Sequence, residues 1–598
     1  MSASNRKKIR KEQAMAYMSE RQRKEADEQK KMKRYTLTFW VVLALCVCIV
    51  LSTVVSVPIK SMLTRNTDAV TVGEHTLSAV ELNYFYLDAI NEWYNSYGSY
   101  ASYFGLTTSK PLSSQVYDST LGTTWADQFL NMALENIKST YALYEMAMKE
   151  NFKLSEDEQA SVDSMIDNLE DTIKSYRELY QNMGYTYNYK NATDYIQGMY
   201  GKAATLKSYQ AYYEVCTIAK AYYTAHSDSL EYDDAALRAF ENGKFEEYSS
   251  YTFAYYYFNA TNFREGGTKS EDGKTTTYTE EEKQAAIDTA KRLADEIAAG
   301  TYEDLDAFDK AINALLTNHF KKSNASTEKD TKTGDNDTSD KTDDTSKEEV
   351  KLQYTSTKME DTLYSNINTL FVDWLIGKEK TEEDAENKDE EVTLTVRQEG
   401  ELTVIVSESG SGDSKTVNGY YVLRFGSVND NTFALKNVRH LLVSFKGGSY
   451  NSTTGQTTYT DAEKEAAKTE AEKLLAEFQA GTTTEEAFAK LATEKTGDTG
   501  SKENGGLYED VYPGQMVTNF NDWCFDETRE VGDVGLVESS YGWHIMYFVG
   551  DSETTYRDYM LENDLRTEEM TEWHDGLVKA IAFKVLTDKY VNKDLILG

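Results

Sequence analysis

Two of the chain's six histidines stand where they could form one chemical centre. His440 lies within NVRHLLVSF (437–445) and His544 within YGWHIMYF (541–548). Both segments are apolar and aromatic, which is typical of buried strands. A lone histidine in a buried strand is most simply a hydrogen-bonded core residue. If the two strands pair, however, the imidazoles can meet, and the pair becomes a candidate functional centre.

The segments around these histidines resemble the parvulin peptidyl-prolyl isomerases. The resemblance rests on four stretches in order over about 115 residues: VRHLLV, an A-F-A-x-L-A helix, NGGLYEDVYPGQMVTNFNDWCF and YGWHIMYF. The whole layout is similar to the PrsA-type extracytoplasmic foldases of Gram-positive bacteria and the SurA-like periplasmic chaperones. It implies an isomerase that needs neither a cofactor nor a metal.

The resemblance also implies which residues form the site. The catalytic positions correspond to His440, His544, Asp498 and Ser539. The apolar positions that hold the substrate's proline ring correspond to Leu507, Met516 and Phe520. Two features depart from the family pattern: no acid separates Gly506 from Leu507, and an extra residue lies between Leu507 and Gln515.

These residue types suit prolyl isomerisation. The amide must lose its resonance on twisting, against a barrier of ~18–20 kcal/mol. A pocket accelerates this step when it binds the twisted amide better than either planar form. Apolar side chains can grip the proline ring while polar groups stabilise the twisted amide. The alternative is that the two histidines only brace the sheet through hydrogen bonds.

An internal repeat extends this organisation. Residues 247–430 and 437–552 each read as strand, helices, short strands and a final strand. Each copy opens a helix with a T-x-x-E capping box, and the matched pairs are Thr279/Glu282 and Thr460/Glu463. In the first copy Phe253 and Tyr421 replace the histidines, and the G-x-M-x-x-x-F motif is missing. We therefore expect two tandem parvulin-like α+β domains, the first of them degenerate.

The remaining segments complete an α+β multidomain chain. Residues 67–240 show helical apolar periodicity and predict an all-α, chaperone-like domain. Residues 554–598 predict a C-terminal helical segment. Residues 322–348 contain no large apolar side chain and predict a disordered insertion within the first copy.

The N-terminus predicts a membrane anchor. Residues 1–34 carry 12 Lys or Arg and 5 Asp or Glu, a net charge of +7. Residues 35–58 contain an uncharged apolar run long enough to span a bilayer. The basic flank places residues 1–34 in the cytoplasm, as a tail before an uncleaved transmembrane signal anchor. We expect a single-pass protein of the cell membrane with the bulk of the chain outside, and the resemblance to PrsA-type foldases implies a Gram-positive bacterium.

Charge and cysteine usage narrow the partners. The chain carries a formal net charge of −37, and the part after residue 34 carries −44, which argues against a nucleic-acid partner. Only Cys216 and Cys524 lie beyond the apolar run, in different expected domains, so no disulfide is suggested. The expected partners are unfolded or partly folded exported polypeptides with X-Pro bonds. The sequence leaves open whether the chain forms a homodimer.

Three functions fit this reading to different degrees. A foldase that isomerises X-Pro bonds in exported proteins explains the intact second copy. A non-catalytic holdase chaperone, using parvulin-like domains to bind clients, is the alternative. A structural surface protein with parvulin-like spacers explains the degenerate first copy but not the preserved second one.

Overall fold

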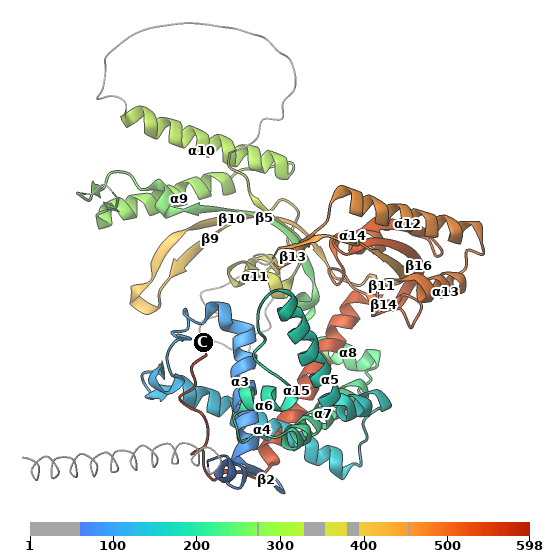
Figure 1. The fold of residues 1–598 in the computed structure, drawn as a ribbon. Helices are drawn as coiled ribbons and strands as arrows, with labels where there is room; N and C mark the ends of the chain where they lie inside the picture. The colour runs from blue at the N-terminus through green and yellow to red at the C-terminus, as the bar shows by residue number, and fades with distance from the viewer. Residues whose placement is uncertain (1–59, 272–273, 328–352, 379–393, 452–454, 598) are drawn as a thin grey trace, which may run out of the picture. The chain divides into compact units, whose positions relative to one another are not determined.

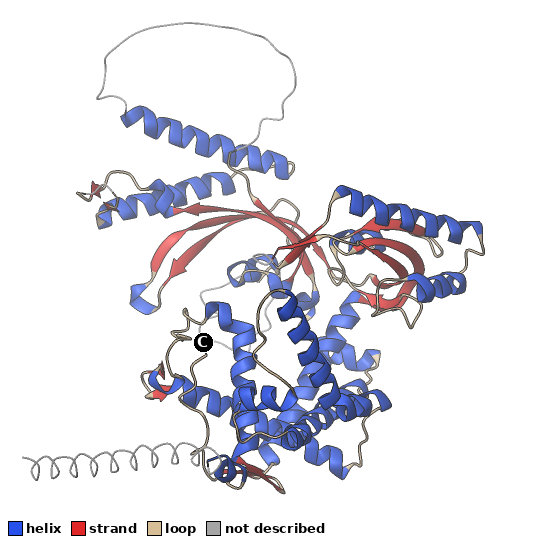
Figure 2. Cartoon of the chain, viewed as in Figure 1, coloured by secondary structure: helices blue, strands red, loops and turns tan. Residues whose placement is uncertain are grey.

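The chain combines a helical N-terminal region with β-sheet domains, as the α+β prediction requires (Figures 1 and 2). The computed structural model describes residues 60–271, 274–327, 353–378, 394–451 and 455–597. Two compact units divide the chain: residues 1–231 with 566–598, and residues 232–565.

The predicted basic tail and membrane anchor, residues 1–34 and 35–58, lie outside the described residues. Among the helices that the structure does describe, none is both long and apolar enough to cross a membrane.

Helices make up most of the first unit. They are α3 Ala79–Tyr97, α4 Trp125–Lys149, α5 Glu156–Asn182, α6 Ala192–Tyr200 and α7 Leu206–Asp228. Hydroxyl side chains cap most of their N-termini, and at the start of α5 Ser155 and Glu158 form a reciprocal capping box. These caps satisfy backbone N–H groups of the first turn that have no partner within the helix.

The prediction that residues 67–240 are all-α was wrong. Strands β1 Asp68–Val72, β2 His75–Ser78 and β17 Phe583–Val585 form a sheet in the order β17-β1-β2. Two short strands, β3 Val116–Asp118 and β4 Thr123–Thr124, form a second pair. Strand β17 comes from the C-terminal segment, which was predicted to be helical. No local sequence pattern indicates the pairing of β1 with β17, whose residues are more than 500 positions apart.

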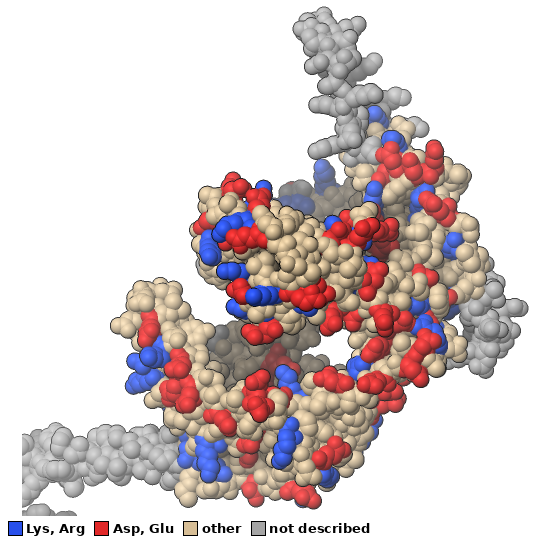
Figure 3. Space-filling model, turned by 90° about the vertical axis from the view of Figure 1, so that its right-hand side faces the viewer, with Lys and Arg blue, Asp and Glu red and all other residues tan. Residues whose placement is uncertain are grey.

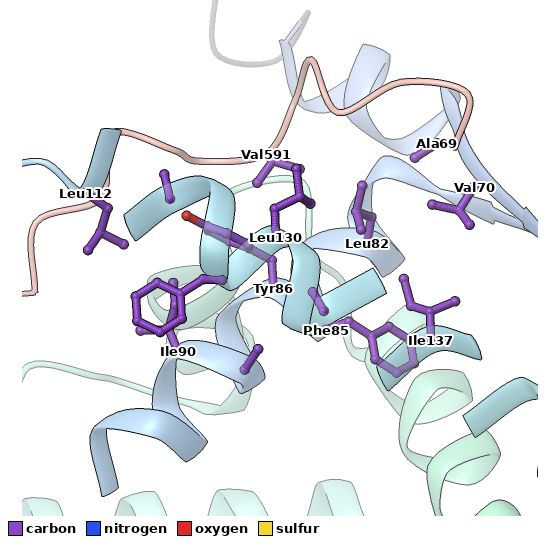
Figure 4. Close-up of a cluster of buried hydrophobic side chains, with 14 of the residues drawn as sticks. Ala69, Val70, Leu82, Phe85, Tyr86, Ile90, Leu112, Leu130, Ile137 and Val591 are labelled. Atoms are coloured by element: carbon purple, nitrogen blue, oxygen red, sulfur yellow. The ribbon is translucent and has the colours of Figure 1, made fainter. Parts of the chain in front are cut away.

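The core of this unit lies between α3, α4 and the C-terminal segment (Figure 4). Phe85, Tyr86 and Ile90 of α3 pack with Leu130 and Ile137 of α4, and all are buried. Val591 reaches the same cluster from the C-terminal end of the chain. Much of the aromatic content of this unit is therefore core.

The second unit begins with α8 Asp234–Glu241 and a four-stranded antiparallel sheet in the order β8-β5-β10-β9. The strands are β5 Ser250–Asn259, β8 Thr357–Leu363, β9 Leu402–Ser409 and β10 Thr416–Asn429. One face packs against α9 Glu280–Ala298 and α10 Leu305–Thr327. The other face packs against the short helix α11 Thr369–Leu375.

A second sheet of the same design follows, in the order β14-β11-β16-β15. Its strands are β11 Ala434–Ser444, β14 Leu507–Val511, β15 Val534–Glu538 and β16 Gly542–Thr555. Helices α12 Asp461–Ala480 and α13 Glu485–Lys495 cover one face. Helix α14 Thr518–Cys524 packs on the other, beside both histidines.

The internal repeat is confirmed at the level of local structure. Both predicted capping boxes form, at the starts of α9 and α12. In each copy the capping glutamate also accepts a backbone hydrogen bond from a glycine, Gly267 or Gly448, at 2.9 Å. Each glycine directly precedes a short hairpin. The hairpins are β6 Thr268–Lys269 with β7 Thr276–Thr277, and β12 Ser449–Asn451 with β13 Gln456–Thr458.

The prediction of a disordered insertion at residues 322–348 was wrong at its start, because residues 322–327 are helical. Helix α10 continues through Thr327, because the residues before it include no helix breaker. The rest of the predicted insertion lies outside the described residues.

Helix α15 Tyr556–Ala580 confirms the predicted C-terminal helix, but the chain then returns to a strand, β17. The visible face in Figure 3 carries many Asp and Glu side chains among fewer Lys and Arg, in keeping with the net negative charge. Such a surface disfavours contact with polyanions.

Candidate active site

Strands β11 and β16 bring the two strand histidines together. In their antiparallel register His440 lies opposite Met546 and Leu442 lies opposite His544, so the histidines are diagonal neighbours on one face. Their Nδ1 atoms lie 3.0 Å apart, and their rings are stacked with centroids 5.2 Å apart. The two residues are 3% and 5% exposed. The predicted pair therefore forms, and it is buried.

Asp498 reaches the pair from the loop that follows α13. The loop is tied to β11 at both backbone groups of Leu442: Gly497 N–H donates to the Leu442 carbonyl at 2.7 Å, and Leu442 N–H donates to Thr496 Oγ1 at 3.0 Å. This anchoring places Asp498 Oδ2 3.0 Å from His440 Nε2. Asp498 was the least direct of the sequence assignments, and the structure brings it into the site.

Two polar residues of the site were missed by sequence reasoning. Ser501 is 2% exposed, its Oγ lies 3.2 Å from His440 Nε2, and its hydroxyl donates to Asp498. Tyr508 donates its hydroxyl to Asp498 Oδ2 at 3.2 Å, and its ring lies 5.2 Å from the His440 ring. Serine in a polar loop carries no signal of its own, so only the fold identifies Ser501.

Tyr508, not Leu507, lies on the histidine face of the sheet. In the register of β11 with β14, Tyr508 pairs with Val438 and Leu507 pairs with Arg439. Successive strand residues point to opposite faces, so Leu507 shares the helix-covered face with Arg439, which forms an ion pair with Glu485 of α13. The prediction that Leu507 lines the pocket was therefore wrong. Placing Tyr508 at the family's leucine position removes the extra residue before Gln515, although the residue between Gly506 and Tyr508 is then Leu507 and not an acid.

Gly506 explains why the Gly-Gly turn precedes this strand. Its φ of +76° favours glycine, and its carbonyl accepts a 2.8 Å hydrogen bond from His440 N–H. A Cβ at this position would lie 2.1 Å from the His440 carbonyl oxygen. The turn therefore allows β14 to start directly against β11, beside the first histidine.

Phe520 and Met516 form the apolar side of the site. Phe520 is the third residue of α14, and its ring stands edge-on to both imidazoles, at 5.5 Å from His440 and 5.4 Å from His544. Phe520 is buried. Met516 lies four residues earlier, before the start of α14, is half-buried and packs against the apolar cluster that contains Phe520. Phe520 is therefore adjacent to the histidine pair, and Met516 packs against the apolar cluster that contains Phe520.

Ser539 closes the other end of the pair. It lies in the turn between β15 and β16, and its Oγ is 2.7 Å from His544 Nε2. The backbone N–H of Tyr541 donates to the same oxygen at 3.1 Å. Beside it is a surface hollow of about 360 Å³, whose lining includes Val517, Asn519 and Ser539.

The electrostatics keep the histidines neutral and the carboxylate charged. Burial lowers the pKa of His440, although Asp498 opposes the shift. Burial and the neighbouring His440 lower the pKa of His544 to about 4. Burial would raise the pKa of Asp498, but hydrogen bonds from Ser501, His440 and the Gly500 backbone outweigh it and lower the value to about 2.

These charge states fix the direction of the hydrogen bonds. An ionised Asp498 accepts only, so His440 Nε2 carries a proton and donates to it. His440 Nδ1 is then the acceptor for a proton on His544 Nδ1. His544 Nε2 accepts in turn from Ser539 Oγ. The result is one ordered chain from Ser539 through both imidazoles to Asp498.

Solvent reaches this series of hydrogen bonds at its two ends and not at its centre. Asp498, Tyr508, Met516 and Ser539 are half-buried, while both imidazoles are almost fully enclosed. A bound molecule would therefore touch the carboxylate, the phenol and the apolar side chains. The imidazoles act on it chiefly by positioning these groups.

Residues 420–551 match the family model of the PPIC-type PPIase domain. A foldase protein PrsA 1 of Listeria monocytogenes is 33% identical over 94 residues, which are 14% of this chain and 32% of the relative. A foldase protein PrsA of Caldanaerobacter subterraneus is 34% identical over 103 residues, 16% of this chain and 33% of the relative. This chain thus spans about a third of the length of these relatives.

Among solved structures, a peptidylprolyl isomerase (PrsA) from Bacillus anthracis is similar to part of the chain. The identity is 20%, with 25% of this chain and 59% of that chain covered and a TM-score of 0.17.

Proposed function

We propose that this chain, which contains a parvulin-type PPIase domain within residues 420–551, catalyses the cis–trans isomerisation of X-Pro bonds in exported polypeptides. The single observation that carries the proposal is the ordered chain from Ser539 to Asp498 beside the apolar pair Met516 and Phe520. It joins a site for a proline ring to a fixed negative charge.

Met516 would contact the proline ring, and Phe520 would support it from behind. Phe520 is as deeply buried as the two imidazoles, and its contacts with both of them hold it rigidly in place. Met516 is half-buried and adaptable, which suits a ring that must be held while the preceding amide turns. Binding energy at the ring can then be used for the twisted state of the amide.

Asp498 would act on the amide itself. Amide resonance moves negative charge onto the carbonyl oxygen and gives the C–N bond its double-bond character. A carboxylate beside that oxygen opposes this charge shift and so favours the twisted, non-resonant amide. Asp498 suits this task because it is half-buried and its pKa is about 2, which keeps it charged at neutral pH.

His440 and His544 are positioning residues in this proposal. They are too deeply buried to meet a peptide, but His440 holds Asp498 and both rings support Phe520. A well-folded variant that lacks one imidazole should therefore lose activity through misplacement of Asp498 and Phe520.

The test is refolding of a protein whose folding is limited by X-Pro isomerisation, with catalytic amounts of the full chain in mild detergent. Wild type should accelerate the slow phase, and Met516→Ala and Asp498→Asn should each remove most of the acceleration. Arg439→Lys, on the opposite face of the sheet, is the control that should stay active. No acceleration by well-folded wild type would exclude the isomerase function.

Membrane anchoring and an extracytoplasmic position are a further part of the proposal. They are supported by the basic segment 1–34 followed by the apolar run within 35–58. In intact cells, added protease should digest the chain beyond residue 60 and spare the N-terminal segment. Protection of the whole chain would overturn this placement.

A holding activity is a second candidate, favoured by exposed aromatic side chains in the first unit. Between α3 and α4, Tyr100 is 65% exposed and Tyr103 87%, and Leu121 is 75% exposed. Apolar exposure of this kind marks interaction surfaces. Suppression of client aggregation that persists in Asp498→Asn, and falls in Tyr100→Ser/Tyr103→Ser, would assign holding to this surface.

A further inference from the structure

The first sheet of the second unit contains a counterpart of the candidate active site, with tyrosines in place of both histidines. The register of β5 with β10 places Tyr255 opposite Leu423 and Tyr257 opposite Tyr421. In the second sheet His440 lies opposite Met546 and Leu442 opposite His544. If Tyr421 corresponds to His544, Tyr255 therefore corresponds to His440.

This register corrects the sequence comparison, in which Phe253 took the place of His440 in the first copy. An ungapped alignment of the two first strands differs from the structural pairing by two residues. A two-residue shift preserves the face of the strand, so Phe253 and Tyr255 point the same way and the sequence cannot choose between them.

The aromatic rings repeat the geometry of the second site. Ring centroids of Tyr255 and Tyr421 lie 5.8 Å apart, and Phe371 lies 5.2 Å and 5.0 Å from them. The corresponding distances among His440, His544 and Phe520 are 5.2, 5.5 and 5.4 Å. Like Phe520 in α14, Phe371 is the third residue of its seven-residue helix, α11.

The apolar half of the site is also present. Ile367 precedes Phe371 by four residues, as Met516 precedes Phe520, and both members of the first pair are buried. The G-x-M-x-x-x-F motif itself is missing from this copy, as predicted, but Ile367 and Phe371 occupy the places of its methionine and phenylalanine.

What differs is the chemistry at the centre. Phenols replace the imidazoles, and Tyr257 adds a third ring stacked on Tyr421 at 4.3 Å. All three tyrosines are half-buried, so ring surface remains accessible. Within the described part of the chain their hydroxyls make no hydrogen bond, although burial and the neighbouring Tyr257 and Tyr255 raise the pKa of Tyr421 and keep it a neutral donor.

We propose that Tyr255, Tyr257 and Tyr421, supported by the buried ring of Phe371, bind a proline-containing extended peptide segment without isomerising it. The proposal rests on the proposed function, in that the second site supplies the template for a proline pocket. Proline-rich segments dock on aromatic side chains because the pyrrolidine ring is rigid and apolar. Free tyrosine hydroxyls can donate to the carbonyls of such a segment. One chain would then hold a client at one copy while the other acts on it.

The test is calorimetric titration of the full chain with an extended peptide that has one Leu-Pro and no aromatic residue. Wild type should bind two peptides per chain. Tyr257→Ser/Tyr421→Ser should leave one site and full isomerase activity, and Met516→Ala/Phe520→Ala should leave one site without activity. In the latter background the tyrosine substitutions should weaken binding by about tenfold, as expected for loss of ring contacts.

Tyr256→Ser is the matched control, because Tyr256 is half-buried on the same strand but faces α9 on the opposite side of the sheet. Binding unchanged by the Tyr257/Tyr421 substitutions, or equal binding of a peptide with Pro replaced by Ala, would overturn the proposal. Inactive wild type whose remaining peptide binding still depends on these tyrosines would instead contradict only the proposed catalysis.

A second measurement avoids any effect of substitution on folding. A peptide with a photoreactive group next to its proline, added to wild type, should label β5, β10 or α11 as well as the second site. Labels confined to the second site would likewise overturn the proposal.

Discussion

The Nδ1 atoms of His440 and His544 lie 3.0 Å apart in a buried site, with Asp498 beyond one imidazole and Ser539 beyond the other. Two protonated nitrogens could not face each other at this distance, so one must accept. The charged Asp498 decides which one, because it takes the Nε2 proton of His440 and leaves Nδ1 of that ring as the acceptor. The charged Asp498 carboxylate therefore sets the donor–acceptor direction of every hydrogen bond from Ser539 to Asp498.

Replacing Asp498 by asparagine should lower kcat/KM for an X-Pro peptide by about 100-fold, the scale of losing one preorganised electrostatic group. The amide preserves the shape, and its oxygen can still accept from His440, Ser501 and Tyr508, but it removes the negative charge and the acceptor of the Gly500 N–H. A protease-coupled peptide assay measures the loss, and circular dichroism checks the fold. Activity equal to wild type would mean that the charge of Asp498 has no catalytic role.

His544 should stay neutral well below the pH at which histidines usually titrate. In histidine-labelled full chain it should show the ¹⁵N ring shifts of neutral imidazole at pH 5.5, and the pKa of His440 should lie below its ordinary value. Because Asp498 is also untitrated above pH 4, activity should be flat between pH 6 and 8. A titration of either buried ring near pH 6.5 would contradict the ordered chain.

Stability should fall on the acid side for the same reason. The folded-state pKa of His544 lies below its unfolded value of roughly 6.5, so the folded state binds fewer protons. Its contribution is complete above that pH and is lost as the pH falls towards 4. Between pH 7 and 5 this amounts to about 2 kcal/mol. Hydrogen exchange of the β11 and β16 amides at the two pH values measures it, and His544→Phe should flatten the dependence.

Substitution of the buried Arg557 should destabilise the second unit more than substitution of the partly exposed Arg238. Arg557 is 1% exposed, pairs with Glu241, and donates to the Asp430 and Phe245 carbonyls at 2.8 and 2.6 Å. Arg557→Ala should cost about 3–5 kcal/mol, because it removes the buried partner of Glu241, which keeps only Arg238, and leaves the Asp430 and Phe245 carbonyls without their donor. Arg238→Ala, whose side chain is 39% exposed, should cost about 1 kcal/mol or less. Equal effects in urea unfolding would show that burial is not the cause.

Alanine at Gly506 should disrupt the site, whereas alanine at Gly514 should not. Both glycines have φ near +80°, so both substitutions carry backbone strain. Only at Gly506 would the new Cβ collide with the His440 carbonyl; around Gly514 there is open space. Gly506→Ala should therefore lose activity and cost at least about 2 kcal/mol more than Gly514→Ala. Thermal unfolding of the two variants, with activity assayed in parallel, gives the comparison.

Much of the site could be predicted from the sequence because its signals are local. Rare histidines inside apolar strands, a Gly-Gly turn, and Met516 four residues before Phe520 can all be recognised within short windows. The repeated capping boxes and the buried faces of α9 and α12 were predictable for the same reason, since helix starts and apolar periodicity depend on neighbouring residues. The sequence by itself thus determined the histidine pair, most of the other site residues and the internal repeat.

Tertiary structure decided what depends on register and on long-range pairing. Leu507 and Tyr508 are adjacent in sequence, and only the pairing of β14 with β11 shows which one faces His440. Ser501 enters the site only because Gly497 and Thr496 bind its loop to β11. The alternation of strand side chains makes one position the difference between the two faces of a sheet, and that choice is set by hydrogen bonds between strands distant in sequence. The same cause hid β17 in the first unit and Tyr255 in the first repeat.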